Sequence, residues 1–146
     1  MSLIEKAYAK LHGCYEALIS GHVNEGIQDL TGLQPEKVFI RDEKTGNLSK
    51  TIQSHYGGRE GFWKFLQSRK QDNCLMGCSV AGNGKSGPQF VDGRATGLIL
   101  NHAYGITDVI ELKAADGIQH HILRLRNPWG KSEWLGRWSS DSEEIS

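Results

Sequence analysis

The sequence has little of what marks a nucleic-acid-binding, membrane or disulfide-rich protein. Its 17 lysine and arginine residues are balanced by 17 aspartate and glutamate residues, so bulk charge gives no basis for binding nucleic acid or an acidic membrane. No apolar run approaches the roughly 20 residues of a membrane span. Three cysteines among 146 residues are too few for a disulfide framework, so we expect reduced thiols and a cytoplasmic, intracellular location.

The composition instead predicts one globular domain with long loops. A chain of 146 residues is one domain's worth and can bury roughly 70% of its extended-chain surface. Its 18 glycines exceed the average share and favour short elements joined by long connections. Met1 leads straight into an expected helix, so we expect no signal peptide.

The first half of the chain has the periodicity of amphipathic helices. Apolar residues recur there at three- and four-residue spacing, which places them on one face of a helix. The pattern predicts three helices, over residues 3–20, 24–30 and 58–71. In the first, Cys14 falls on the apolar face and Gly13 lies in the interior, so we expect a buried thiol and a close neighbour. Asn24 is expected to cap the second helix.

The second half has the patterns typical of strands. Strands are predicted at residues 38–40, 74–80, 98–102, 104–113 and 119–126. The glycine-rich segment 81–96 is expected to be a long mobile loop, and Asp116-Gly117 is expected to be a hairpin turn. Helices in one half and antiparallel strands in the other predict an α+β fold, with the N-terminal helices packed on an antiparallel sheet.

Two residues of the second half suggest catalytic chemistry. His102 and Asn127 stand at the ends of predicted strands, and Trp129 follows two residues later. Histidine exchanges protons near neutral pH, and an asparagine carbonyl can hold its second ring nitrogen without adding a buried charge. A tryptophan over that hydrogen bond would exclude water. The three residues can cooperate if the strand ending at Arg126 pairs beside the strand ending at His102.

Residue types alone leave a structural role open. A histidine at a strand edge is more often structural than catalytic, and Asn127-Pro128 is also an ordinary start of a turn. The neighbouring His120 and His121 point to opposite faces of a strand, so we do not expect them to share a metal ion.

Three motifs resemble the calpain family of cysteine proteases. Residues 5–18 are similar to the opening of the second half of the calpain protease core. Gly97-Leu98 followed by His102-Ala103-Tyr104 resembles the family's histidine motif. A third segment resembles the family's asparagine motif. It runs Arg124-Leu125-Arg126-Asn127-Pro128-Trp129-Gly130 and is followed by Glu133-Trp134, Gly136 and Trp138-Ser139. The motifs follow the family's order and span most of the chain.

The resemblance implies a papain-like protease core divided into two subdomains. Residues 3–146 would form the second subdomain, and Met1-Ser2 before them are compatible with an expression leader. In this subdomain His102 would be the general base, Asn127 would orient it, and Trp129 would shield the pair. The loop within 87–96 would gate the substrate cleft.

The nucleophile is missing from this pattern. The family's catalytic cysteine and its oxyanion glutamine belong to the preceding subdomain, and Cys14, Cys74 and Cys78 match no catalytic position. The resemblance therefore implies a calcium-dependent intracellular endopeptidase acting on proteins and peptides, of which this fragment is inactive without the upstream subdomain. The alternative is a non-catalytic homologue that serves as an interaction or regulatory module.

The resemblance implies calcium as the cofactor, which would align the two subdomains. Glu133 matches one of the family's carboxylate ligands, but Ser140 stands where the family has aspartate and Asp141 comes one residue late. Because calcium needs six to eight oxygen ligands, binding by this chain alone is expected to be weak or absent. The histidine motif also has Asn101 and Gly105, where the family commonly has glycine and serine.

Overall fold

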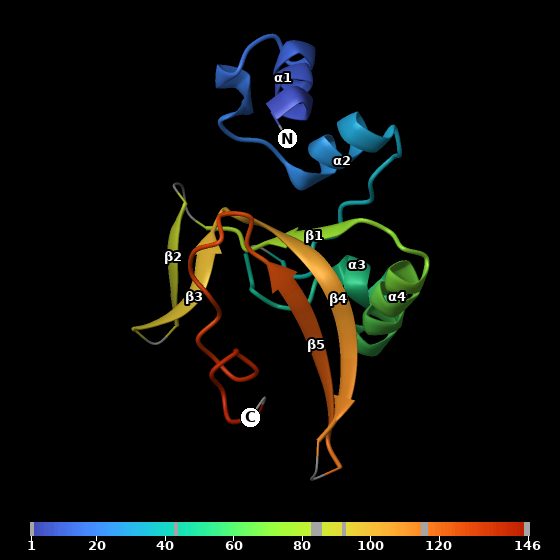
Figure 1. Ribbon diagram of the computed structural model, residues 1–146. Helices are drawn as coiled ribbons and strands as arrows, with labels where there is room; N and C mark the ends of the chain where they lie inside the picture. Colours follow the sequence, from blue (N-terminus) through green and yellow to red (C-terminus); the bar gives the residue numbers. More distant parts are fainter. Residues whose placement is uncertain (1, 43, 83–85, 92, 115–116, 145–146) are drawn as a thin grey trace. The chain divides into compact units, whose positions relative to one another are not determined.

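The computed structural model describes residues 2–42, 44–82, 86–91, 93–114 and 117–144. The chain forms two compact units, residues 1–37 and 38–146. Helices make up the first unit, and the strands of the described residues lie in the second (Figure 1). Within the described part of the chain, no helix combines the length and hydropathy that a membrane span requires. The predicted α+β fold class is confirmed.

The first unit is held together by polar contacts between its two longer helices. Its elements are α1 (Ser2–Leu11), the short 3-10 helix η1 (Glu16–Leu18) and α2 (Val23–Thr31). Asp29 of α2 accepts a hydrogen bond from the Tyr8 hydroxyl and lies against Nε2 of His12, at 3.0 Å in each case. α2 starts one residue before the predicted boundary, and His22 rather than Asn24 is its cap.

The predicted first helix, over residues 3–20, is too long. α1 ends at Leu11, and Gly13 takes φ +98°, a conformation that a right-handed helix excludes. A Cβ on Gly13 would meet nothing within 4 Å, so the expected close neighbour is absent. Cys14 is exposed, which makes the prediction of a buried thiol wrong.

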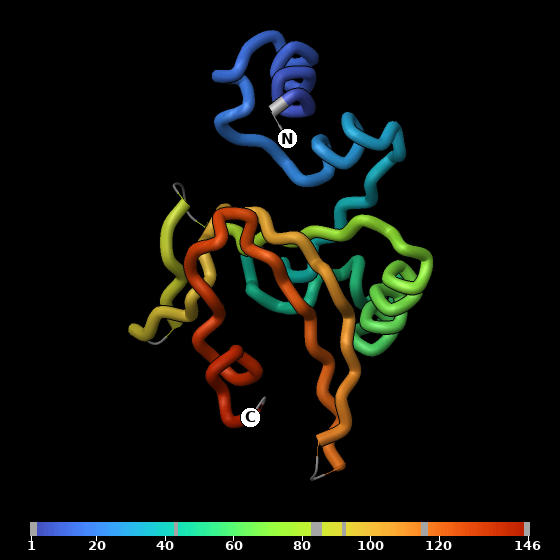
Figure 2. Tube along the Cα trace, viewed as in Figure 1, coloured from blue at the N-terminus to red at the C-terminus, as the bar shows by residue number. Residues whose placement is uncertain are grey.

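The second unit is built around one antiparallel sheet and one separate hairpin. The sheet has the strand order β1-β4-β5, and the hairpin pairs β2 with β3. Their bounds are β1 (Met76–Ser79), β2 (Gly87–Val91), β3 (Arg94–Leu100), β4 (Ala103–Lys113) and β5 (Gln119–Arg126). The tube of Figure 2 shows the long ribbon that β4 and β5 make together and the irregular segment that follows β5.

Two helices, α3 (Lys50–His55) and α4 (Arg59–Gln71), precede the sheet. α4 confirms the predicted third helix and packs on the sheet, where the Lys70 ammonium donates to the carbonyl of Thr107 at 2.7 Å. Trp63 is the buried residue of α4, and it stacks on His121 with ring centroids 4.3 Å apart. α3 was not predicted; Ser49 caps it by accepting from the Ile52 N–H.

Several strand predictions need correction. Residues 38–40 form no named strand; an isolated bridge joins Arg41 to Leu48 instead. The glycine-rich segment 81–96 is not one long loop, because it contains β2 and the start of β3. β3 pairs with β2, so the strand before His102 does not pair with the strand ending at Arg126.

Parts of two predicted features fall where the structure gives no description. Asn83, Gly84, Lys85 and Asp92 of the predicted loop, and Asp116 of the predicted hairpin turn, lie outside the described residues. On the described side of that turn Gly117 has φ +83°, which glycine tolerates best.

Few of the described side chains in the second unit are buried. Among these residues Ile52, Trp63 and Tyr104 are the buried hydrophobic ones, and His102 is buried with them at 7% exposure. Cys78 of β1 is half-buried, and Cys74, two residues before that strand, is exposed. His102 is therefore part of the small core rather than a loose loop residue.

Candidate active site

The topology of the sheet brings His102 and Asn127 together. His102 stands one residue before β4 and Asn127 one residue after β5. The two strands are antiparallel neighbours, with Gly105 opposite Arg126, so the residues flanking these ends meet at one edge of the sheet. Nε2 of His102 lies 2.8 Å from Oδ1 of Asn127. The pair forms across β4 and β5, so it does not need the strand before His102 to pair with the strand ending at Arg126.

The surroundings of Asn127 determine which way its carboxamide points. The Trp129 N–H, which can only donate, lies 3.0 Å from Oδ1. The Lys131 carbonyl, which can only accept, receives a hydrogen bond from Nδ2. Both partners require the same orientation of the amide, so the atom facing the imidazole is an acceptor.

An acceptor opposite Nε2 selects one tautomer of His102. Nε2 must carry its proton to donate to Asn127 Oδ1, so the neutral ring has its lone pair on Nδ1. Within the described residues, Nδ1 has no hydrogen-bond partner. The imidazole is thus presented with one nitrogen held and the other able to take a proton, which is the arrangement that a general base needs.

A tight turn places both Asn127 and Trp129. The Gly130 N–H donates to the Asn127 carbonyl at 3.1 Å, and Pro128 occupies the second position, where its restricted φ suits a β-turn. The hydrogen bond from the Trp129 N–H to the Asn127 side chain makes the same segment an Asx turn. The sequence Asn-Pro-Trp-Gly therefore orients the carboxamide by local chemistry alone.

Two aromatic rings contact the imidazole. The Trp129 ring is tilted over His102 at a centroid distance of 4.0 Å, although 58% of Trp129 is exposed. Tyr104 meets the imidazole edge-on at 5.0 Å, and its hydroxyl accepts from the Ile99 N–H at 2.9 Å. Trp129 shields one side of the ring, and the buried Tyr104 supports it.

Sequence reasoning missed Tyr104 as a supporting residue. Its position two residues after His102 is the signal that could have found it, because side chains two apart in an extended segment share a face. Sequence reasoning also missed that Gly97 allows β3 to approach the backbone of Glu133 closely. Gly97 has φ +84°, and a Cβ there would overlap the Glu133 carbonyl. The signal in the sequence is weak, because Glu133 lies more than thirty residues away.

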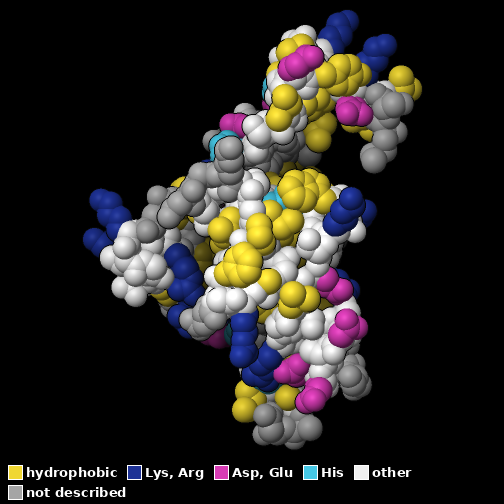
Figure 3. Space-filling model, turned by 90° about the vertical axis from the view of Figure 1, so that its left-hand side faces the viewer, with side chains coloured by type: hydrophobic (Ala, Val, Ile, Leu, Met, Phe, Trp, Pro, Cys, Tyr) yellow, Lys and Arg dark blue, Asp and Glu magenta, His cyan; other side chains and the backbone are white. Residues whose placement is uncertain are grey.

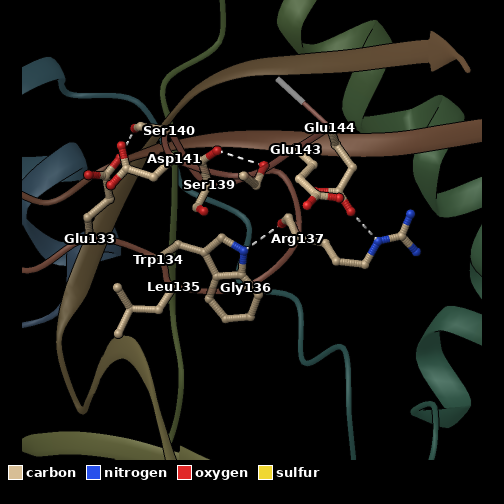
Figure 4. Close-up of a pocket in the computed structure, with 11 residues that line it drawn as sticks. Glu133, Trp134, Leu135, Gly136, Arg137, Ser139, Ser140, Asp141, Glu143 and Glu144 are labelled. Carbon is tan, nitrogen blue, oxygen red and sulfur yellow. Dashed lines mark hydrogen bonds and ion pairs between the residues drawn. The ribbon is translucent and has the colours of Figure 1, made fainter. Parts of the chain in front are cut away.

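Glu133, the predicted calcium ligand, lines a separate hollow of about 380 Å³ in the segment after β5. Figure 4 shows the ring of Trp134 in the middle of this hollow, with Glu133, Ser140 and Asp141 at one end. The Ser140 hydroxyl donates to the Glu133 carboxylate.

The residues of this hollow do not make up a calcium site. Among the residues that the structure describes, no group of three or more His, Cys, Asp or Glu side chains is arranged to hold a metal ion. Calcium takes six to eight oxygen ligands, and one carboxylate of the hollow, Glu133, already accepts from Ser140.

At the other end of the hollow Arg137 pairs with Glu144 at 2.6 Å. The hydrogen bond from Arg137 lowers the pKa of Glu144 to about 2. The Trp134 indole N–H donates to the Arg137 carbonyl at 2.7 Å, so this ion pair and the indole belong to one local network (Figure 4). The network orders the segment that follows the turn Asn127-Pro128-Trp129-Gly130.

Comparison with known proteins agrees with this arrangement of motifs. The family model described as "Calpain family cysteine protease" matches residues 1–146. The chain belongs to the calpain family. Human calpain-2 catalytic subunit is 34% identical over 140 residues, covering 96% of this chain and 17% of that protein. Calpain-8 of Mus musculus is 38% identical over 143 residues, covering 98% of this chain and 18% of that protein.

The chain thus spans less than a fifth of the length of the calpains that it matches. Human calpain-9 shows the same relation, with 34% identity over 98% of this chain and 18% of that protein. The family to which the chain belongs is a family of cysteine proteases.

Proposed function

We propose that this chain supplies the general base His102 and its orienting residue Asn127 to a calpain-type cysteine endopeptidase. The observation that carries the proposal is the 2.8 Å contact of His102 Nε2 with Asn127 Oδ1, with Trp129 over the ring and Nδ1 left to accept a proton. The nucleophilic cysteine comes from the upstream protease subdomain. Among the described residues no cysteine is hydrogen-bonded to His102, which supports this division.

In the proposed reaction, Nδ1 of His102 takes the proton of the cysteine thiol. The resulting thiolate attacks the peptide carbonyl carbon, and the imidazolium then gives its proton to the leaving amine as the carbon–nitrogen bond breaks. Water hydrolyses the thioester with His102 again acting as base. Throughout, Asn127 Oδ1 holds the Nε2 proton, so the ring cannot rotate away from the reacting atoms.

The surface of the second unit is consistent with a partner subdomain and peptide substrates. Figure 3 shows hydrophobic side chains gathered on one face of this unit. Large hydrophobic residues that stay more than half exposed include Phe90, Val91, Trp129 and Leu135. A contiguous apolar face, unlike scattered apolar residues, marks a surface that binds other chains. We propose a cytoplasmic setting for the assembled protease, consistent with three free cysteines.

Calcium dependence belongs to the same proposal, with weak or no binding by this chain alone. The support is the donor set: Glu133 and Asp141 are the nearest match to the family's ligands, and Glu133 is engaged by Ser140. Titration calorimetry with calcium chloride tests it. Millimolar or weaker affinity for this chain is expected, and micromolar affinity would contradict the proposal.

The activity is tested by joining this chain to its native upstream segment and measuring cleavage of an unstructured peptide with calcium present. Removing the base by His102→Ala should lower turnover at least about 100-fold. His120→Ala is the matched control, because His120 packs near Trp138 and not at the site, and it should keep activity. Unchanged turnover in His102→Ala would contradict the assignment of His102 as the general base.

The alternative of a non-catalytic homologue is resolved by the upstream residue at the nucleophile position. Cysteine there favours the protease. Serine or glycine there, together with no peptide cleavage by the joined protein, favours an interaction or regulatory module.

A further inference from the structure

Asn101, the residue directly before His102, has an unusual backbone conformation. Its φ is +52°, in the left-handed region that glycine and asparagine tolerate and most other residues avoid. It makes the turn between β3 and β4. Glycine could take the same conformation, so the carboxamide of Asn101 is not needed for the turn itself.

The carboxamide instead pairs with the backbone of Gly82. Oδ1 of Asn101 accepts from the Gly82 N–H at 2.8 Å, and Nδ2 donates to the Gly82 carbonyl at 3.2 Å. A side chain that satisfies both the donor and the acceptor of one residue acts like a neighbouring strand. The contact joins residues 19 positions apart, so it is tertiary.

The backbone of Asn101 extends this contact to both sides of Gly82. Its N–H donates to the Val80 carbonyl at 2.8 Å, just after β1. Its carbonyl accepts from the Ser86 hydroxyl at 3.1 Å, just before β2. Asn101 therefore ties the end of β1 and the start of β2 to the turn that presents His102.

Gly82 is shaped for this contact. A Cβ at residue 82 would lie 2.8 Å from Cβ of Leu100 and 3.3 Å from Nδ2 of Asn101. Only glycine lets the backbone approach the β3 end this closely. Gly82 and Asn101 are therefore two halves of one clasp, defined here as the pair of hydrogen bonds between the Asn101 carboxamide and the Gly82 backbone.

We propose that Asn101 is a positioning residue for His102. The clasp holds the start of the β2–β3 hairpin against the turn that precedes His102. In this way it keeps the imidazole hydrogen-bonded to Asn127. This role rests on the proposed function for its effect on turnover, but the clasp itself is measurable without activity. A glycine at residue 101 would keep the turn and lose the clasp.

The first test measures amide hydrogen exchange at Gly82 and the imidazole Nε2–H signal of His102 by NMR, using the full 146-residue chain. Asn101→Gly should speed exchange at Gly82 by roughly threefold to tenfold, the effect of one lost hydrogen bond. Exchange of the His102 Nε2–H should rise with it. Asn101→Asp keeps the acceptor and loses the donor. Its exchange rates at Gly82 and at His102 Nε2–H should therefore lie between those of the native chain and those of Asn101→Gly. Unchanged exchange at both atoms overturns the proposal.

General loss of stability is separated by a matched control. Ser49→Ala removes the cap of α3, far along the chain from His102, and should lower the urea midpoint while leaving the His102 Nε2–H signal unchanged. An equal effect of Ser49→Ala on that signal would show that Asn101 acts only through stability and would overturn the positioning role.

A double-mutant cycle tests the pairing. Gly82→Ala should cost at least as much as Asn101→Gly, because its Cβ also meets Cβ of Leu100. In the Gly82→Ala background, Asn101→Gly should add less than it does in the native chain, because the clasp is already lost. Fully additive effects would contradict a shared clasp.

The joined protease supplies the functional arm. Asn101→Gly should lower kcat several-fold with KM within about twofold, since the imidazole rather than the substrate is displaced. A change in KM alone would overturn the positioning of His102. If the joined protein with Asn101 intact cleaves no peptide, the proposed function fails, while the exchange measurements still decide the clasp.

Discussion

The backbone carbonyl of Glu133 occupies the place where a side chain at Gly97 would begin. A Cβ built on Gly97 would stand 1.7 Å from that oxygen and 3.1 Å from Cα of Trp134. The Leu135 N–H donates to the Thr96 carbonyl at 2.9 Å beside this contact. β3 thus packs directly against the segment that follows the turn at Asn127, and this contact orders both sides of the candidate site.

Gly97→Ala should therefore destabilise the second unit strongly. The left-handed φ of +84° costs an alanine about 1–2 kcal/mol, and the overlap with a backbone atom cannot be relieved by a rotamer change, so the total loss should be about 2–5 kcal/mol. Urea unfolding measures it. Gly46→Ala is the control, with φ +68° and open space around its Cβ; equal losses in the two variants would contradict the packing account.

Asn127→Ala should lower kcat of the joined protease about 100-fold with KM little changed, because in the proposed reaction Asn127 orients the base His102 and not the substrate. Asn127→Asp should be milder, since its oxygen can still accept from His102 Nε2 and the Trp129 N–H while only the donor to Lys131 is lost. Asn47→Ala, in an exposed turn, is the control. An aspartate variant as poor as the alanine variant would show that the donor to Lys131 matters more than the imidazole contact.

The three cysteines should react with iodoacetamide at different rates. Burial raises the pKa of the Cys78 thiol, which lowers its thiolate fraction and its access to the reagent. Cys14 and Cys74 are exposed. At pH 8 we expect Cys78 to be modified at least about tenfold more slowly than either, as measured by mass spectrometry of timed digests. All three should react alike in urea, and a slow Cys14 in the folded chain would point to the buried position that the helix pattern predicted.

Glu144 should titrate at an unusually low pH. Its pKa falls from the ordinary 4.5 to about 2 because Arg137 donates a hydrogen bond to the carboxylate. A lowered pKa in the folded chain means that the stabilising effect is present above pH 4.5 and is lost as the pH falls toward 2. Carboxyl-carbon NMR of Glu144 measures the midpoint, and Arg137→Gln should return it toward 4.5. A midpoint near 4.5 with Arg137 intact would exclude the pairing in solution.

Much of the fold could be predicted where the pattern is local. The alternation over 104–113 and 119–126 matches β4 and β5 closely, and the periodicity over 58–71 predicts α4. The failures have local causes as well: Gly13 ends α1 nine residues before the predicted end, and the pattern of apolar residues continues past it. Periodicity reports which positions share a face, but a single glycine can change the backbone direction.

By itself, the sequence determined the residue types and the local turn of the candidate site. His102 and the segment Asn127-Pro128-Trp129-Gly130 stand out in the chain, and the turn chemistry that orients the Asn127 amide is local. Tertiary structure alone decided the strand register that brings His102 to Asn127, the contact of Gly97 with Glu133, and the clasp between Asn101 and Gly82. Each of these joins residues far apart in the chain, where contact depends on strand register and close packing that no local pattern encodes.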